Sequence, residues 1–175
     1  MRYDILESPL GELLVAADDA GLRKLSFLAG SGACVPGKTW QRARGAFAGL
    51  AAELEAYFSG EPVSFSAPVA GDGTAFQRRV WRALCDIPHG TVASYGDIAR
   101  AIGSPGSVRA VGAANGANPI AIVVPCHRVI GSDGGLTGYA GGLDIKRQLL
   151  AIEGIEVDGR DRVNDGVGQV SLPLR

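Results

Sequence analysis

Apolar and polar positions alternate near the start of the chain. Apolar residues recur over 3–6, 13–17 and 22–28, with turn-forming residues at 9–11 and 18–21 between these stretches. The alternation predicts three strands of an antiparallel sheet joined by tight turns.

The residues that follow the expected strands change in character. Gly-, Ser- and Pro-rich residues 29–39 predict a loop, and apolar residues at helical spacing over 47–58 predict a helix that covers one face of the sheet. Residues 63–65 fit a short strand. The first part of the chain is therefore expected to be a small sheet with one helix.

The second part has helical periodicity instead. Thr74 and Gln77 form a capping-box pattern ahead of an apolar stripe that ends near Ile87. Ser94 precedes a short helix expected at 95–102, and Ser107 precedes a third that runs to about residue 115. Two short helices joined by a tight turn are typical of a helix-turn-helix, although αα-hairpins are also common in proteins that never bind DNA.

The change of pattern predicts an α/β protein with a boundary near Gly71. Residues 1–70 would form a sheet-and-helix domain, and residues 71–154 a mainly helical domain that ends with a helix over 144–152. Residues 155–175 are polar, Gly-rich and non-periodic, and we expect a flexible tail there.

The third helix has an unusual composition. Residues 108–117 contain four alanines and two glycines, and each interior glycine costs about 0.5–1 kcal/mol relative to alanine. Close packing against a neighbouring helix would explain the small residues. Close approach to a nucleic-acid backbone or groove would explain them equally, with Arg109 as the only long side chain.

Charge is unevenly distributed although the net charge is only −1. Residues 76–150 carry eight basic and four acidic side chains, which suits a phosphate-facing surface but also fits a merely solvated face. No apolar run approaches the roughly 20 residues that cross a bilayer, and the first residues lack a secretory signal pattern. We expect a cytoplasmic protein that does not bind membranes.

Cysteine usage argues against a disulfide framework or a zinc site. The chain has three widely spaced cysteines and two histidines, without any Cys-x-x-Cys pair. We therefore expect no metal and at least one free thiol.

One cysteine has the surroundings of a nucleophile. Residues 118–125 form an apolar run between two prolines that predicts a buried strand or extended segment, and this run ends at Cys126. The thiolate is the nucleophilic form of cysteine, and the adjacent His127 could generate it, through a water if the two side chains diverge. The local pattern fits a reactive cysteine and an inert core cysteine equally well.

The sequence around Cys126 resembles the active-site signature of the O6-alkylguanine-DNA alkyltransferases, also called methylated-DNA–protein-cysteine methyltransferases. The similarity includes Pro-Cys-His-Arg-Val-Ile at 125–130 and extends over the whole of residues 74–154, in segments at 76–81, 94–99, 118–120, 138–143 and 149–154. Residues 1–70 are similar in outline only. The resemblance implies an α/β fold with an N-terminal ribonuclease-H-like small sheet and helix and a mainly helical C-terminal domain containing a helix-turn-helix.

The resemblance also implies a reaction. Cys126 would take the alkyl group from O6-alkylguanine in one irreversible displacement, which makes the protein an enzyme of a single turnover. His127 would be the general base that acts through water, and Glu153 would hold the imidazole in the correct tautomer. Tyr95 would rotate the nucleotide and donate a hydrogen bond to the leaving base. Without the resemblance, Tyr95 would be interpreted as an apolar residue at the start of a helix, and Glu153 as an acidic side chain exposed to solvent.

Double-stranded DNA with an alkylated guanine is the implied partner, and its damaged base would be flipped out of the helix through the minor groove. Arg109 would fill the vacated stack. The implied DNA-contacting residues are Ser94, Arg109, Ala110, Gly112, Ala113 and Ala114, and the implied base pocket comprises Asn118, Val129, Tyr139 and Ala140. Asn118 would also link the third helix, which would be the recognition helix, to the active-site loop.

The resemblance implies a monomer that needs no cofactor. It leaves open cooperative binding to DNA, the range of alkyl groups and the repair of O4-alkylthymine. Two other functions fit some of the same residues. A lesion sensor would use the helix-turn-helix and not need Cys126, and a different Cys–His enzyme, such as a cysteine hydrolase, would recover its free thiol after each turnover.

Overall fold

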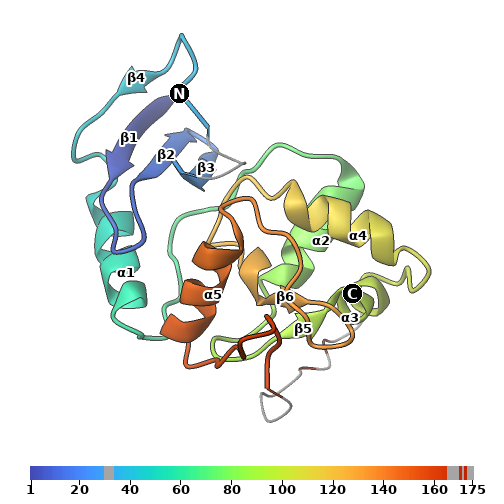
Figure 1. The fold of residues 1–175 in the computed structure, drawn as a ribbon. Coiled ribbons are helices and arrows are strands. Elements are labelled where there is room, and N and C mark those ends of the chain that lie inside the picture. The colour runs from blue at the N-terminus through green and yellow to red at the C-terminus, as the bar shows by residue number, and fades with distance from the viewer. Residues whose placement is uncertain (30–33, 165–169, 171, 173–175) are drawn as a thin grey trace.

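The computed structural model describes residues 1–29, 34–164, 170 and 172 as two lobes that lie side by side (Figure 1). Part of the expected loop (30–33) and part of the expected tail (165–169, 171 and 173–175) lie outside the described residues. Among the described helices, none combines the length and apolar character needed to cross a membrane.

The expected antiparallel sheet is confirmed and forms the N-terminal lobe. A fourth, two-residue strand, which the sequence pattern did not predict, pairs in parallel with the first, so the sheet is mixed and has the order β3-β2-β1-β4. The expected helix is also confirmed and buries Leu50, Leu54 and Tyr57. The elements of this lobe are β1 (Arg2–Leu6), β2 (Leu13–Asp18), β3 (Gly21–Phe27), β4 (Gln41–Arg42) and α1 (Ala48–Phe58).

The short strand expected at 63–65 is wrong. This segment has no strand structure, and the connection to the second lobe makes only one isolated bridge to the sheet, between Val69 and Leu22. Pro62 and Pro68 flank the segment, and a proline has no backbone N–H to donate to a sheet.

The four helices expected in the C-terminal lobe are confirmed. Both side chains of the Thr74–Gln77 capping box are in place, and Ser94 forms a second capping box with Asp97. Ser107 occupies the N-cap position of the third helix, but its side chain makes no capping hydrogen bond. The elements of this lobe are α2 (Ala75–Leu84), β5 (Ala93–Ser94), α3 (Tyr95–Ala101), α4 (Val108–Gly116), the 3₁₀ helix η1 (Cys126–Arg128), β6 (Val129–Ile130) and α5 (Leu143–Ile152).

Residues 120 and 122–125 are buried as expected and residues 118, 119 and 121 are half-buried, but the segment forms consecutive turns instead of a strand. The Val124 amide donates to the Ile120 carbonyl, while the Asn118 side chain accepts from the Ile120 amide and donates to the Val124 carbonyl. The chain turns sharply at Ile122, whose φ of 69° lies in the left-handed region. Local hydrogen bonds from Asn118 thus curl the segment into turns, and its pairing with the sheet is limited to one bridge between Ile120 and Leu25.

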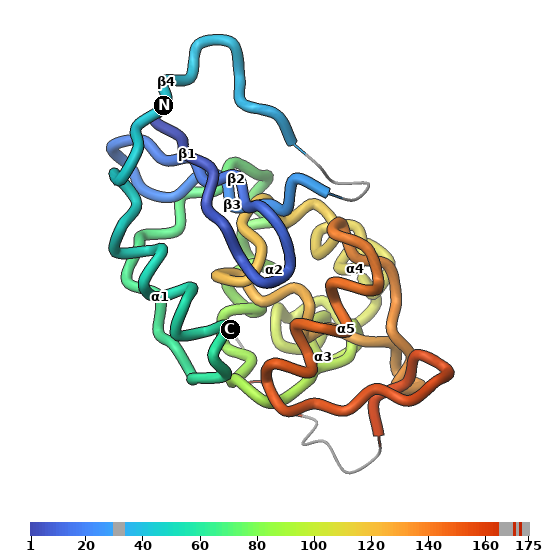
Figure 2. Tube along the Cα trace, turned by 60° about the vertical axis from the view of Figure 1, so that its left-hand side comes forward, coloured from blue at the N-terminus to red at the C-terminus, as the bar shows by residue number. Residues whose placement is uncertain are grey.

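The two lobes share backbone hydrogen bonds and one core. The Leu25 amide on β3 donates to the Pro119 carbonyl, and the Ala121 amide donates to the Leu25 carbonyl. Apolar side chains of both lobes form one cluster, which contains Leu13 of the sheet and Leu149 of α5. Figures 1 and 2 show the sheet and α1 on the same side of the C-terminal lobe in two orientations. The sheet edge therefore holds the segment that leads to Cys126.

The expectation of a flexible tail from residue 155 is wrong for residues 155–164. Ile155 and Val163 are buried and cluster with Leu150 of α5, and Val157 pairs with Val163 in an antiparallel bridge. The Leu136 amide donates to the Asp161 carbonyl at 2.7 Å. These few apolar side chains are spaced too irregularly to show a periodic pattern, but they suffice to anchor the segment.

We expect Ile155→Ala to lower the free energy of unfolding by about 2–5 kcal/mol, because it removes a side chain that is only 1% exposed. Glu156→Gln, at the exposed neighbouring position, serves as the control and should change stability by less than about 0.5 kcal/mol. Chemical denaturation measures both. Equal, small effects of the two variants would mean that the segment is not anchored.

Candidate active site

Cys126 is buried between the lobes and held by two asparagines. Cys126 is the first residue of the 3₁₀ helix η1 and is 5% exposed. Asn118 Nδ2 lies 3.0 Å from the Cys126 sulfur, and Asn115 Nδ2 lies 3.4 Å from the Cys126 carbonyl oxygen. Both asparagines lie at or just beyond the C-terminal end of α4, so this helix is tied directly to the thiol.

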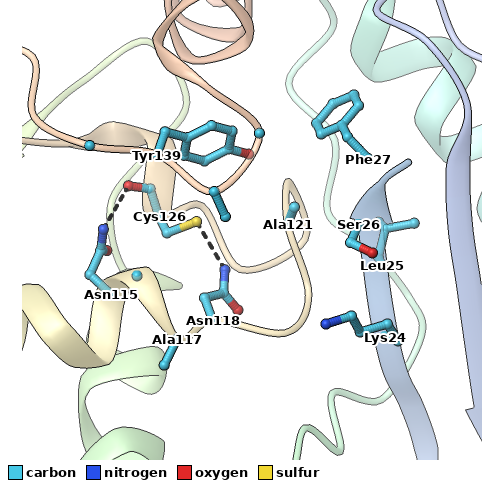
Figure 3. Close-up of a pocket in the computed structure, with 14 residues that line it drawn as sticks. Lys24, Leu25, Ser26, Phe27, Asn115, Ala117, Asn118, Ala121, Cys126 and Tyr139 are labelled. Carbon is cyan, nitrogen blue, oxygen red and sulfur yellow. Dashed lines mark hydrogen bonds between the residues drawn. The ribbon is translucent and has the colours of Figure 1, made fainter. Parts of the chain in front are cut away.

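A cavity of about 240 Å³ gives access to the thiol. Figure 3 shows Cys126 and Asn118 on one side of it, with the β3 side chains Lys24, Ser26 and Phe27 on the other. The active-site loop, residues 131–142 between β6 and α5, borders the cavity near Gly141, where a Cβ would meet the Tyr139 ring at 3.0 Å and the Phe27 ring at 3.3 Å. The lining residues are Lys24–Phe27, Asn115–Asn118, Ala121, Cys126 and Gly138–Gly141.

The surroundings of Cys126 favour the protonated thiol. Burial raises the pKa of Cys126 above its ordinary value, and the hydrogen bond from Asn118 and the charge of Lys146 offset only part of this shift. A thiol of this kind needs a base before it can act as a nucleophile near neutral pH.

His127 is fully buried and hydrogen-bonded through one ring nitrogen. Its Nε2 lies 2.7 Å from Glu153 Oε1, while Nδ1 is buried and has no hydrogen-bond partner among the described residues. A carboxylate can only accept, so Nε2 carries the proton and Nδ1 keeps its lone pair. No described hydrogen bond joins the Cys126 sulfur to the imidazole, so the histidine would have to act through an intervening water.

Glu153 accepts hydrogen bonds from three side chains and one backbone amide. Besides His127, these are the Tyr57 hydroxyl at 2.8 Å, the Arg128 guanidinium, which reaches both carboxylate oxygens at 2.8–3.1 Å, and the Gly90 amide at 3.2 Å. Burial alone would raise the pKa of Glu153, but the hydrogen bonds and charges of His127 and Arg128 lower it far below its usual range. Glu153 is therefore ionised.

Burial has the opposite consequence for His127. It lowers the pKa of His127 below the usual value, and this effect exceeds the hydrogen bond and charge of Glu153, which raise the pKa. The imidazole is neutral near pH 7 and able to accept a proton at Nδ1. The pair thus provides an oriented base close to the thiol.

Lys146 is a buried cation that the sequence analysis did not single out. Its Nζ donates to the Val129 carbonyl at 2.6 Å and lies 3.4 Å from the Thr137 carbonyl. Burial lowers the pKa of Lys146 to about 8, and its charge favours the Cys126 thiolate. The sequence contained a signal, because Lys146 interrupts the apolar stripe of α5 three residues before Leu149.

Tyr95 and Tyr139 both approach the thiol. The Tyr95 hydroxyl lies 2.6 Å from Thr137 Oγ1 on the active-site loop, and burial raises the pKa of Tyr95 despite this hydrogen bond. The Tyr139 hydroxyl is buried without a partner among the described residues. Val129, expected in the base pocket, is fully buried, does not line the cavity and binds Lys146 through its carbonyl.

Some of the α4 residues that were expected to contact DNA are exposed on the surface. Arg109, Ala110 and Ala113 are exposed, and Gly112 is half-buried. A Cβ on Gly112 would lie 3.8 Å from the Tyr95 ring, an ordinary contact, so packing within the protein does not require a glycine there.

Two of the expected DNA-contacting side chains are not available. Ser94 is buried and engaged in the capping box with Asp97. Ala114 is also buried and lies on the inner face of α4, where its carbonyl accepts from the Trp81 indole at 2.8 Å. Helix capping and core packing already use these two side chains, and the contacts of the two residues with DNA stay a prediction.

No group of three or more His, Cys, Asp or Glu side chains that could hold a metal ion occurs in the described ranges. The expectation that the protein binds no metal nevertheless stays a prediction.

The fold and site define a class of two-lobed proteins in which a buried cysteine lies beside a His–Glu pair and a helix-turn-helix. Residues 1–70 match the family model for the ribonuclease-like domain of 6-O-methylguanine DNA methyltransferase, and residues 75–155 match the model for its DNA-binding domain. The chain belongs to the O6-methylguanine DNA methyltransferase family.

Individual relatives agree with this assignment. The chain is 53% identical over 153 residues to a methylated-DNA–protein-cysteine methyltransferase of Methanosarcina barkeri. The matched region covers 87% of this chain and 97% of that protein. It is 49% identical to the protein of the same name from Mycobacterium tuberculosis, over 87% and 92% of the two chains. The Mycobacterium tuberculosis protein OGT, solved in complex with DNA, superimposes with a TM-score of 0.81 at 48% identity, over 87% of this chain and 92% of that one.

We expect nuclear magnetic resonance of ¹⁵N-histidine to show His127 as the Nε2–H tautomer, with a pKa below about 6.5. The chain has two histidines, so His89→Gln leaves only the two ring-nitrogen signals of His127 to assign. Because the folded-state pKa of His127 is lowered, its contribution to stability is present above about pH 6.5 and is lost as the pH falls through that lower pKa. An Nδ1–H tautomer would exclude the proposed orientation of the base.

Proposed function

We propose that this protein repairs DNA by transferring the alkyl group of O6-alkylguanine irreversibly to the sulfur of its own Cys126. The observation that carries the proposal is the buried thiol at the cavity wall beside an imidazole whose Nε2 is held by Glu153 and whose Nδ1 is free to accept a proton. The names of the relatives, which describe methylated DNA and an acceptor cysteine, support the same reaction.

The proposed step is a single displacement. The bond between Cys126 Sγ and the alkyl carbon forms while the bond between that carbon and guanine O6 breaks. The thiol proton passes through a water to Nδ1 of His127, the departing guanine anion takes a proton from solvent water, and the imidazolium afterwards releases its extra proton to solvent. The Tyr95 hydroxyl would donate a hydrogen bond to the guanine as negative charge develops on it. The thioether has no reverse route, so each molecule reacts once.

Access to the thiol requires the nucleotide to leave the base stack, since Cys126 lies inside the protein. In our proposal, α4 enters the minor groove through Ala110, Gly112 and Ala113, and Arg109 occupies the space left by the flipped base. The base would lie in the cavity against Asn118, Tyr139 and Ala140, which line it.

This proposal retains the further expectations from the sequence. The partner is duplex DNA with an alkylated guanine, the reaction needs no cofactor, and one chain in the cytoplasm acts alone.

Incubation of the protein with a duplex containing O6-methylguanine should add one methyl group per molecule, on the peptide that contains Cys126. Mass spectrometry of the digested protein measures the adduct. Cys126→Ser is the matched control, because it keeps the size of the side chain and removes the thiol. An adduct that persists on Cys126→Ser, or the absence of one on the wild type, would refute the proposed acceptor.

Ala110→Leu should weaken binding to undamaged duplex about tenfold or more, because a longer side chain on the exposed face of α4 would obstruct the groove. Leucine is nearly as good a helix former as alanine, so stability should change by less than about 0.5 kcal/mol. Ala151→Leu, exposed on α5, is the matched control and should bind DNA like the wild type. Equal affinities for all three proteins, measured by fluorescence anisotropy, would argue against groove entry by α4.

A further inference from the structure

Tyr57 brings a side chain of the N-terminal lobe into the His–Glu pair. It lies on α1, is 1% exposed, and its hydroxyl lies 2.8 Å from Glu153 Oε1 and 3.2 Å from His127 Nε2. Glu153 and His127 belong to the C-terminal lobe, at the end of α5 and in η1.

The geometry assigns a direction to each hydrogen bond. The Glu153 carboxylate only accepts, so the single hydroxyl proton of Tyr57 is donated to it. The remaining lone pairs of the hydroxyl face Nε2 of His127 and can accept its proton. The single Nε2–H is then shared between Glu153 Oε1 at 2.7 Å and the Tyr57 oxygen at 3.2 Å, so the hydroxyl is a second acceptor that favours the tautomer with the proton on Nε2 and the lone pair on Nδ1.

The Tyr57 ring is fixed by its neighbours. Its ring centroid lies 5.5 Å from that of Phe58 in an edge-to-face arrangement and 6.2 Å from that of Phe65. Burial, together with the adjacent charge of Glu153, raises the pKa of Tyr57 far above its ordinary value, so the hydroxyl keeps its proton at physiological pH.

We propose that Tyr57 is a positioning residue for the transfer reaction: it holds His127 and Glu153 in the arrangement that leaves Nδ1 as the base, and so makes the ribonuclease-like lobe part of the reactive site. This inference rests on the proposed function. A tyrosine that only fills the core would contribute through its ring, whereas a positioning residue acts through its hydroxyl. Removal of the hydroxyl oxygen alone therefore distinguishes the two roles.

Tyr57→Phe removes the hydroxyl and keeps the ring. Single-turnover methyl transfer from O6-methylguanine duplex should slow roughly tenfold, because the imidazole loses one of its two orienting contacts. The midpoint of the acid limb of the rate should move to higher pH, because Glu153 loses a donor and stabilises protonated His127 more strongly. DNA affinity should be unchanged. Tyr3→Phe makes the same chemical change far from the site and should react like the wild type.

The tautomer and pKa of His127, measured in the unreacted protein by ¹⁵N resonance, provide a readout that does not depend on transfer. A raised His127 pKa or a population of Nδ1–H in Tyr57→Phe would support the proposal. A rate, pH profile and histidine spectrum identical to those of the wild type would overturn it. If the wild type itself transfers no methyl group, the proposed function fails, and the histidine spectra alone then decide the role of Tyr57.

Discussion

The ionised carboxylate of Glu153 is the interaction on which the rest of the site depends. Its hydrogen-bond donors come from α1, from the loop at Gly90 and from η1, so one group joins the two lobes and the segment that bears the thiol. A buried charge is tolerated only when it is paired, and removal of a partner from such a group typically costs about 3–5 kcal/mol. Since the same carboxylate orients His127, the stability of the fold and the reactivity of the site are coupled through it.

The thiol is placed so that burial controls its reactivity. Burial keeps the pKa of Cys126 above its ordinary value, while Asn118 and the buried Lys146 favour the thiolate. The resting site therefore holds a protonated thiol beside a neutral base, and charge develops only when the proton moves to His127. A nucleotide must enter the cavity to meet this thiol, which restricts the reaction to bases that can leave the stack.

The sequence predicted the elements whose cause is local. The strands β1, β2 and β3, the helix α1 and the four helices of the second lobe follow from periodicity and from caps such as Thr74. The turns over 118–125 could not be predicted in this way, because they depend on the Asn118 side chain and on pairing with Leu25, far away in sequence. Tyr57 was missed for the same reason, since 96 residues separate it from Glu153. The resemblance of a local motif led us to propose Cys126, His127 and Glu153 as the reactive group, but it did not point to Tyr57, which the other lobe contributes.

The end of α4 joins the surface that we propose to face DNA to the proposed nucleophile. Asn115 and Asn118 bond the Cys126 carbonyl and sulfur, so α4 cannot tilt without disturbing the position of the thiol. The chain between Asn118 and Cys126 is also conformationally restricted. Ile122 adopts a left-handed conformation that costs on the order of 1–3 kcal/mol for a β-branched residue, and the bonds of its neighbours to Leu25 of β3 oppose its relaxation. A strained turn held by the N-terminal sheet and a helix held by two asparagines leave the sulfur little freedom. The proposed contact of α4 with DNA and the alignment of the Cys126 sulfur therefore depend on the same rigid part of the structure.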